Sequence, residues 1–548
     1  MNIPNYKLLL FSFLTLFIYS CNTTQQEIAT DTSNLVAELP VFNNYQTSIL
    51  DHGAINDGKT LITEPVAKAI KTCVKAGGGK VTIPRGLWIS GPIELKSNVN
   101  LHLEEGAVVM FSKNLDDYPL IKSNFEGRDE VRAMPLIYAN GADNIAITGK
   151  GIFDGSGQIW RPVKRDKVTG SQWKRIVNGG GVVDEEHNMW YPNEGAMEAA
   201  HNPSLARSTS IMEGKNKYKA YLRPPLVNIV NCNKVLFDGP TFQNSPGWCI
   251  HPLLSKNLTF VNINVRNPWN AQNGDGIDVE SCRYVLIENS TLDVGDDALC
   301  LKSGRNEEGR KRGVPTEDVV IKNCIVYHGH GGFVVGSEMS GGVRNIKITD
   351  CAFMGTDVGL RFKSNRERGG VVENIEISNI YMVDILTNAI GFNLYYNGLS
   401  VVEQNELGED VKINKFQVTE ATPQFKNITI KDIVCNGAHT AIFINGLPEM
   451  PIENMTLNNI HIKSKNGAII SYAKSLTFED VIIDSESENE FEFFDVSNVT
   501  MKASGDKQIT EAKIKISGSE SKDYEINYTN KPLIIVTDDV NPNEIKLD

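Results

Sequence analysis

Residues 344–353, RNIKITDCAF, and residues 373–382, ENIEISNIYM, follow one pattern, in which aliphatic residues alternate with polar ones after an Asn. Alternation with a period of two is typical of a β-strand that buries one face. The pattern recurs along the chain, and its first aliphatic residues are Val235, Leu258, Val285, Val319, Ile346, Ile375, Ile428, Met455 and Leu476. Earlier copies begin near residues 98 and 143.

The copies are 21 to 34 residues apart, except for 53 residues between Ile375 and Ile428, where one turn is skipped or an insertion is hidden. A period of this size, with several short strands in each copy, indicates stacked coils around one continuous core. Leucine-rich repeats need Leu at fixed offsets and a helical half, which are missing, and propeller blades are longer. The sequence therefore predicts an all-β fold, a right-handed single-stranded parallel β-helix, with Asn and Asp stacked at tight corners.

The bulk composition narrows the function classes. Hydrophobic residues make up 41% of the 548 residues and charged residues 22%, which is typical of a globular protein. The net charge is −13, with a pI near 5.3. Nucleic-acid binders usually carry a basic face, so no nucleic-acid partner is expected.

The first residues resemble an export signal. The apolar run from Leu8 to Ile18 is too short to span a bilayer and fits a secretory signal peptide. The stretch IYSC resembles a bacterial lipobox, so we expect residues 1–21 to be a lipoprotein signal with Cys21 as the lipidation site. An ordinary signal peptide is the alternative. Residues 22–44 have the composition of a flexible tether, so the chain would meet a membrane only through its anchor, as an exported lipoprotein of the outer membrane or facing the periplasm.

The rest of the chain, residues 45–548, is predicted to be the β-helix domain. Residues 156–222 interrupt the repeat as an insertion near the groove, and residues 485–548 keep strand-like alternation as late coils or a C-terminal cap. Eight cysteines lie in this domain. A chain of this size does not need disulfides, so we expect buried free thiols. No CxxC pair exists, and a zinc site is therefore not expected.

An acidic pair lies in TLDVGDDALCLKSG, residues 291–304, where a lone carboxylate would be costly to bury. In a β-helix, residues one coil apart stack about 4.8 Å from one another. The repeat places six chemically active residues in one vertical stripe, namely Asp275, Asp296, Asp297, His330, Arg361 and Lys363. We expect Gly295 to let the chain bend so that both carboxylates face one external cleft. Asp278 also lies one coil away and is equally well explained as a structural cap of the turn.

The motifs NGDG, GDD, GHG and RFK, in this order and spacing, resemble those of glycoside hydrolase family 28, the polygalacturonases. The family pattern is N-T-D, D-D, G-H-G and R-x-K. The segment from ILDHGAIND to KVTIPRG resembles the opening of pectin-degrading β-helix proteins, which implies a helix near residues 63–75 that caps the coil. The resemblance covers about residues 49–480. Gly274 stands where the family usually has Thr, which leaves the carboxylates intact but changes the local subsite.

The resemblance implies a glycosidase that cleaves α-1,4-galacturonosyl bonds of pectin with inversion, without a cofactor or metal. Such hydrolysis needs one carboxyl group to protonate the leaving oxygen and another to activate water. Carried over from the family, Asp296 is the general acid, and Asp275 and Asp297 position and deprotonate the water. His330 would hold the protonation state of the acid. One of three clustered carboxylates should have a raised pKa, which a general acid needs at neutral pH.

The resemblance also implies the substrate contacts. Arg361 and Lys363 would bind the carboxylate of a galacturonate ring, since Arg is suited to bidentate contact. The stretch LYYNG resembles a substrate-binding tyrosine region and places Tyr395 near the leaving-group sugar. Lys302, at the end of the DD strand, is a further candidate for substrate contact.

Two alternatives remain open from the sequence. A pectate-lyase-type enzyme would cleave polyuronate by β-elimination and typically binds calcium, but a histidine and two cations beside the acids argue against it. A non-catalytic carbohydrate-binding β-helix would release no reducing sugar. The polymer stays open among homogalacturonan, xylogalacturonan and rhamnogalacturonan, and so does the oligomeric state.

The insertion suggests the mode of attack. Residues 156–222 carry a basic and aromatic patch, rich in Lys, Arg and Trp, in an otherwise acidic chain. Such a patch would attract a polyuronate, and a loop of this length over one end of the groove would leave room only for a chain terminus. The stretch SPGWCIHP, residues 245–252, resembles exo-acting family members. We therefore expect exo-action from the non-reducing end.

Overall fold

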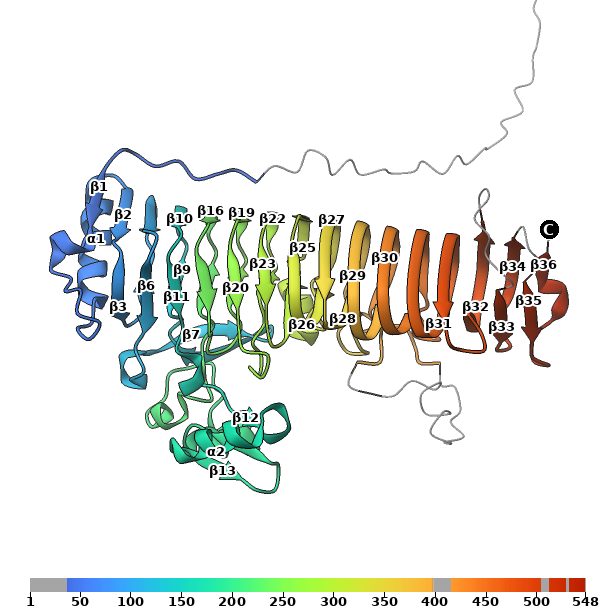
Figure 1. The fold of residues 1–548 in the computed structure, drawn as a ribbon, viewed down its shortest axis with the longest axis horizontal. Helices are drawn as coiled ribbons and strands as arrows, with labels where there is room; N and C mark the ends of the chain where they lie inside the picture. The colour runs from blue at the N-terminus through green and yellow to red at the C-terminus, as the bar shows by residue number, and fades with distance from the viewer. Residues whose placement is uncertain (1–36, 397, 399–414, 504–511, 529–531, 548) are drawn as a thin grey trace, which may run out of the picture.

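The computed structural model describes residues 37–396, 398, 415–503, 512–528 and 532–547. The described chain winds into an elongated parallel β-helix, with its N-terminal coil at one end of Figure 1 and its C-terminal strands at the other. The all-β parallel β-helix predicted from the repeat is thus confirmed. Cys21 and the expected signal peptide lie outside the described residues.

Each coil contributes a strand to the first parallel face. Neighbouring strands on this face are hydrogen-bonded in the order β1 (Gln46–Ser48), β2 (Gly79–Ile83), β5 (Val99–Leu103), β10 (Asp143–Gly149), β16 (Asn233–Asp238), β19 (Lys256–Val261), β22 (Arg283–Glu288), β25 (Thr316–Lys322), β27 (Val343–Met354), β29 (Val371–Asn393), β30 (Gln424–Asn445), β31 (Ile452–Ser485), β32 (Phe491–Lys502), β34 (Lys522–Asn527) and β36 (Ile545–Leu547).

Two further faces complete the coils. The second contains β3 (Gly86–Ser90), β6 (Ala107–Phe111), β11 (Ile152–Asp154), β17 (Thr241–Gln243), β20 (Asn264–Arg266), β23 (Thr291–Asp293) and the first part of β26 (Ile325–Val335). The third contains β4 (Ile93–Glu94), β9 (Ile137–Asn140), β15 (Val227–Val230), β18 (Ile250–Leu253), β21 (Ile277–Glu280), β24 (Asp297–Lys302), the end of β26 and β28 (Thr356–Lys363). Strands β33 (Lys513–Ser517) and β35 (Leu533–Val536) extend the late coils.

The repeat in the sequence is the register of the first face. Val235 pairs with Leu258, Ile346 pairs with Ile375, and the intervening copies pair in the same way. Ile375 also pairs directly with Ile428. No coil is therefore skipped in the 53-residue gap, and the extra residues form an insertion between β29 and β30. These aliphatic residues are buried in one continuous core.

The helices lie outside the coils. Helix α1 (Thr63–Lys75) covers the N-terminal end of the solenoid in Figure 1, which confirms the predicted cap, and Val66, Ile70 and Cys73 are buried on its inner face. The others are α2 (Gly170–Asn178), α3 (Glu194–His201) and α4 (Asn306–Arg312). None of the helices in the described ranges is long and apolar enough to cross a membrane.

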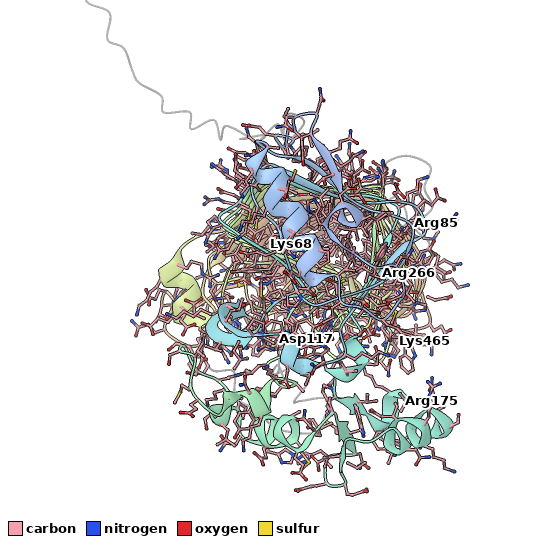
Figure 2. The ribbon with its side chains drawn as sticks, turned by 90° about the vertical axis from the view of Figure 1, so that its left-hand side faces the viewer. Lys68, Arg85, Asp117, Arg175, Arg266 and Lys465 are labelled. Carbon is pink, nitrogen blue, oxygen red and sulfur yellow. The ribbon has the colours of Figure 1, made fainter. Side chains whose placement is uncertain are left out.

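Residues 156–222 form a separate small module beside the coils. It contains an antiparallel sheet of β12 (Val163–Lys164), β14 (Met189–Tyr191) and β13 (Val182–Asp184), together with α2 and α3. The module projects from one side of the solenoid in Figure 1, and the view in Figure 2 shows it below the coils with Arg175 at its edge. The hairpin β7 (Leu120–Phe125) and β8 (Arg128–Ala133) lies outside the three faces.

All eight cysteines of the β-helix domain are buried and unpaired, as predicted from the size of the chain. Their sulfur atoms fill core positions like small apolar side chains.

Asn residues stack at one corner of the coils. Asn345, Asn374, Asn427 and Asn454 all have φ between 55° and 57°, a left-handed conformation that Asn tolerates better than most residues. Each donates its side-chain amide to the residue one coil before, as Asn374 does to Asn345 at 3.3 Å and Asn427 does to Asn374 at 3.4 Å. Asn thus suits this corner for two reasons, because it tolerates the left-handed backbone and its side-chain amide forms the hydrogen bond between coils.

We expect Asn374→Ala to lower the free energy of unfolding by about 2–3 kcal/mol, because it loses two amide hydrogen bonds and strains a left-handed corner. Asn374→Gly removes the same bonds without the strain, so it should cost about 1 kcal/mol less. Thermal unfolding of the three proteins measures the order. Equal losses in both variants would mean that the backbone conformation at this corner carries no penalty.

Candidate active site

The acidic residues of the stripe lie where two adjacent coils of the third face meet. Asp297 is the first residue of β24, Asp296 precedes it, and Asp275 lies in the loop that leads to β21. The backbone N–H of Gly276 donates to Asp297 O at 2.9 Å, and that of His330 donates to Asp296 O at 2.8 Å. The three carboxylates each place one oxygen within 4.8 Å of the others.

The two adjacent carboxylates have different surroundings. The side chain of Asp297 is 3% exposed and that of Asp296 is 22% exposed. Lys363 donates to Asp297 Oδ2 at 2.6 Å, and Arg361 donates to its Oδ1 at 3.2 Å. Burial opposes ionisation, but Lys363 and Arg361 outweigh it and hold the pKa of Asp297 well below its ordinary value. Asp297 is therefore a permanent carboxylate.

Arg361 does not lie in the same column as Asp297, contrary to the single stripe expected from the repeat. Asp297 pairs with Gly331, whereas Arg361 pairs with Val334, three residues further along β26. The guanidinium reaches back along the strand direction to Asp297 and also donates to His330 O at 3.0 Å. The length of the Arg side chain brings the group to the site.

Asp275 is the carboxyl group that is hard to ionise. Burial, reinforced by the neighbouring Asp278 and Asp296, raises the pKa of Asp275 well above its ordinary value. Its Oδ1 is buried without a hydrogen-bond partner among the described residues, and its Oδ2 lies 3.7 Å from Lys302 Nζ. The raised pKa that was expected for the general acid is thus carried by Asp275.

Asp278 does not cap a turn. It lies on β21 with its side chain fully buried, 3.2 Å from Lys302 Nζ. Burial raises the pKa of Asp278 to about 6, even though Lys302 lies beside it. Lys302 is also 3.7 Å from Glu338 and lies over the ring of Trp248. Because Lys302 is buried among acids, its position favours charge compensation under the site over the predicted contact with substrate.

Asp296 forms a pair with His330 at the exposed side of the cluster. His330 Nδ1 lies 3.0 Å from Asp296 Oδ1, which also accepts the backbone N–H of Asp297 at 3.0 Å. The hydrogen bond to Asp296 raises the pKa of His330 above its ordinary value. The pair therefore favours a proton on the His330 imidazole, next to the carboxylate that faces solvent.

Residues 167–477 match the model of the glycosyl hydrolases family 28. The chain belongs to this family. It is accordingly a glycoside hydrolase, and its acidic cluster lies within the matched segment.

Individual relatives span most of the chain. An exo-poly-alpha-D-galacturonosidase of Dickeya chrysanthemi is 26% identical over 507 residues, which cover 90% of this chain and 79% of the relative. A probable polygalacturonase of Vitis vinifera is 27% identical and covers 77% of this chain and 75% of its own. The crystal structure of a hyperthermoactive exopolygalacturonase from Thermotoga maritima is similar with 30% identity and a TM-score of 0.66, over 84% of this chain and 96% of that chain.

Gly295 of this family 28 chain does not serve to bend the backbone, as was expected, but to allow a close approach of another segment. Its φ lies outside the left-handed region, but a Cβ at this position would lie 2.5 Å from Pro268 O and 2.8 Å from Ala271 O. The glycine therefore lets the loop that carries Asp275 approach the acidic pair closely.

Tyr395 lies apart from the carboxylates. Its ring packs against Arg366 at 5.1 Å, and Arg366 forms a bidentate pair with Glu449. The next residue, Tyr396, lies 5.1 Å from Lys363 Nζ. A tyrosine of the LYYNG segment thus borders the site, and the one that contacts the cationic pair is Tyr396. The contact of Tyr395 with a sugar stays a prediction.

Two basic residues of the site belong to none of the four catalytic motifs, although Lys167 lies in the basic patch predicted in the insertion. Lys167, from the insertion, places Nζ 3.4 Å from His330 Nε2. Arg223 is buried and donates to Gln272 O at 2.6 Å and to Asn273 Oδ1 at 2.7 Å, so it fixes the loop before Asp275. Burial together with the neighbouring Arg132 lowers the pKa of Arg223 to about 10, which leaves it charged at neutral pH. A lysine in an irregular insertion has no register from which to infer its position.

Replacing Lys363 tests the charge balance of this family 28 site. Lys363→Met leaves Asp297 buried with Arg361 as its remaining close cation, and we expect a loss of about 3 kcal/mol in the free energy of unfolding at neutral pH. The difference should shrink below about pH 4, because a group with a lowered folded pKa loses its contribution in acid.

The double variant Lys363→Met/Asp297→Asn is the control. It removes the uncompensated charge and should recover part of the lost stability. Denaturant unfolding of the wild type, both single variants and the double variant gives the coupling. A Lys363→Met protein as stable as the wild type would contradict the assigned ion pair.

Proposed function

We propose that this chain is a polygalacturonase that hydrolyses α-1,4-galacturonosyl linkages of pectin with inversion, from the non-reducing end. The observation that carries the proposal is the set of three carboxylates within 4.8 Å, surrounded by cations suited to an anionic sugar. The relatives named above are a galacturonosidase and polygalacturonases, which supports the same substrate class.

Asp296 is the proposed general acid. It is the most exposed of the three carboxylates, and its Oδ1 is occupied by His330 and the Asp297 N–H. We assign the transferable proton to Oδ2, with the protonated imidazole of His330 as the group that restores it. The leaving oxygen of the substrate would accept this proton as the glycosidic bond breaks.

Asp275 is the proposed base. Its raised pKa makes it a stronger base than an ordinary carboxylate once ionised, and its unpartnered Oδ1 can accept a hydrogen bond from the attacking water. Asp297, ionised but held by two cations, would orient that water.

The spacing of the carboxylates favours retention of the anomeric configuration, whereas the bonding partners of the carboxylates favour inversion. Oxygens within 4.8 Å are closer than the roughly 6.5–9.5 Å usual for inverting enzymes and nearer to the roughly 5–5.5 Å of retaining ones. A retaining enzyme, however, needs a free carboxylate as nucleophile. Both oxygens of Asp297 are engaged by cations, and Asp275, whose side chain is 4% exposed, is assigned to the attacking water. We therefore favour direct attack by water, and with it inversion.

Cations from two parts of the chain would bind the uronate. Arg361 comes from β28 and is 23% exposed, whereas Lys363 is nearly buried against Asp297. Arg361 is thus better placed for the sugar carboxylate, and Lys363 would act through Asp297. Lys167 adds a charge from the insertion at the His330 side.

The same insertion supports exo-action. Because Lys167 reaches His330, the insertion extends to the catalytic cluster itself. Arg161, also in the insertion, is buried and donates to Asn244 Oδ1 at 2.9 Å, which fastens the base of the insertion to a coil. An insertion fixed in this way beside the catalytic residues would leave room for the end of a polysaccharide chain but would prevent a polymer from passing through the groove.

We further propose that the chain is an exported bacterial lipoprotein, anchored through Cys21 with its β-helix on the outer membrane or facing the periplasm. The support is the apolar run from Leu8 to Ile18 followed by IYSC. Labelling with a radioactive fatty acid, and its loss in Cys21→Ser, would test the anchor.

Product analysis on defined galacturonate oligomers tests the proposed function. We expect monogalacturonate as the first product, with the inverted anomer in the proton NMR spectrum, and a slow fall in viscosity of polymeric galacturonan relative to reducing ends. Ultraviolet absorbance of unsaturated uronides would instead show β-elimination. A retained anomer would exclude direct attack by water, and an early drop in viscosity would exclude the blocked groove.

Asp296→Asn should lower kcat by about 10²- to 10⁴-fold, because the general acid is lost while the fold is kept. Asp293→Asn is a matched control, since the exposed Asp293 pairs with His328 at 2.9 Å much as Asp296 pairs with His330. The control should stay within about threefold of the wild type. If the two variants are equally active, Asp296 is not the acid.

A further inference from the structure

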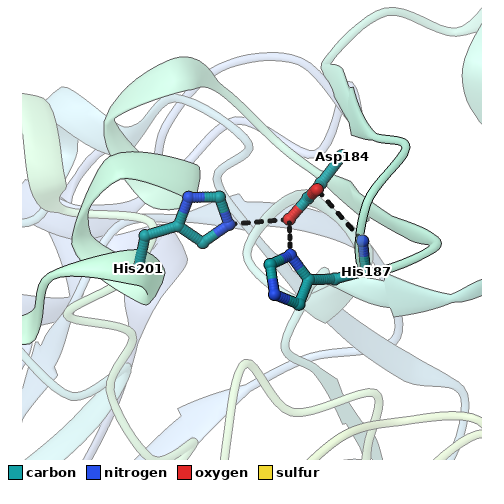
Figure 3. A group of neighbouring side chains, drawn as sticks. All are labelled: Asp184, His187 and His201. Carbon is teal, nitrogen blue, oxygen red and sulfur yellow. Dashed lines mark hydrogen bonds and ion pairs between the residues drawn. The ribbon is translucent and has the colours of Figure 1, made fainter.

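The insertion holds a second cluster of titratable side chains, separate from the acidic site. Asp184 ends strand β13, His187 lies in the turn that follows, and His201 is the last residue of α3. Asp184 Oδ2 lies 2.9 Å from His187 Nδ1 and 2.7 Å from His201 Nε2, as Figure 3 shows. Two imidazole nitrogens thus converge on one carboxylate oxygen.

The donor set is one that binds transition metals. Two His nitrogens and one carboxylate oxygen, completed by water, form a common zinc site with tetrahedral geometry. The three donor atoms lie within 4.8 Å of one another. At bond lengths of about 2.1 Å, tetrahedral ligands are separated by about 3.4 Å, so the separations of His187 and His201 from the carboxylate need to open by about 0.5 and 0.7 Å.

The burial pattern allows this opening. The carboxylate is fixed, because the Asp184 side chain is 5% exposed and its Oδ1 accepts the backbone N–H of His187 at 3.2 Å. The two rings lie at the surface, with His187 55% and His201 45% exposed. One buried anchor and two adjustable rings leave room for water at the remaining position of the ion.

The module around the cluster has little apolar material to hold it together. Apart from Trp160, which joins the main core, and Val168, its buried apolar side chains form two small groups, one with Tyr218 and Leu222 and one with Tyr191, Ala196 and Ala220. Small modules with thin cores commonly need disulfides or metals for stability. The cluster joins the sheet, through Asp184, to the end of α3, through His201.

We propose that Asp184, His187 and His201 bind one divalent transition metal of the Zn²⁺ class, which fastens the sheet of the insertion to helix α3. The site goes beyond the hydrolysis proposed above and takes no part in bond cleavage. The absence of CxxC pairs argued against zinc from the sequence, but that argument covers thiolate sites and not a set of two imidazoles and a carboxylate.

The acidic cluster of the active site is a poorer match for the same ion. Its carboxylates Asp275, Asp296 and Asp297 also lie close together. Lys363 and Arg361 contact Asp297, and Lys302 lies near Asp275, so protein cations already compensate these charges. The single His330 there is paired with Asp296.

Titration with metal tests the proposal. For the full-length chain without a histidine tag, calorimetry with Zn²⁺ should show about one ion per chain, and Co²⁺ should give a visible absorption band of a tetrahedral site with nitrogen ligands. His187→Ala and His201→Ala should each weaken binding by about tenfold or more. The exposure of His187 makes its replacement compatible with folding, which circular dichroism checks.

His328→Ala is the control, because His328 and Asp293 form an exposed His–Asp pair with a similar distance but no third ligand among the described residues. Its affinity for Zn²⁺ should equal that of the wild type. Zn²⁺ should also slow tryptic cleavage of the insertion at Arg207 and Lys215 in the wild type and in His328→Ala, but not in His201→Ala. No binding at about 100 µM Zn²⁺, or equal binding in His187→Ala, would overturn the proposal.

Discussion

Hydrogen bonding between successive coils fixes the distance at which every side chain meets its neighbours. Parallel pairing separates equivalent residues by about 4.8 Å, so a residue type repeated at one position becomes a column. Aliphatic columns form the core, and Asn columns form the corners. The same spacing brings Asp275 and Asp297 from adjacent coils into one site, although 21 residues lie between them in the sequence. Catalytic geometry is here a property of the repeat.

Stacked coils also create an electrostatic difficulty, because like charges in a column repel one another at short range. The chain offsets this with cations on later coils, since Lys363 and Arg361 contact Asp297 from a strand two coils away. Deeper in the same face, Lys302 lies among Asp275, Asp278 and Glu338. The result is a graded set of carboxyl groups, in which Asp297 is held ionised and Asp275 is pushed toward its protonated form.

The periodic parts of the molecule could be predicted from the sequence because register carries over from coil to coil. The column from Val235 to Met455 and the acidic residues of the site follow from the spacing alone. Contacts that depend on the length of a side chain could not be predicted from the spacing. Arg361 is an example, because its Cα lies in another column. The positions of residues in irregular segments could not be predicted from the spacing either. Lys167 and the pair His187 and His201 lie in the insertion, whose path no repeat dictates.

The eight buried thiols have a consequence for how the solenoid can be observed. They are spread from Cys73 at the capping helix to Cys435 in a late coil, and burial lowers the reactivity of most of them, as in Cys232, whose pKa is raised to about 11. Cys324 is the exception, because its hydrogen bond with Cys351 lowers its pKa. Because none is tied to another, reducing agents leave the covalent structure unchanged. The rate at which each thiol reacts with a labelling reagent then reports local unfolding of the coil that contains it. The chain thus carries internal markers that can tell whether its coils separate from the ends or all together.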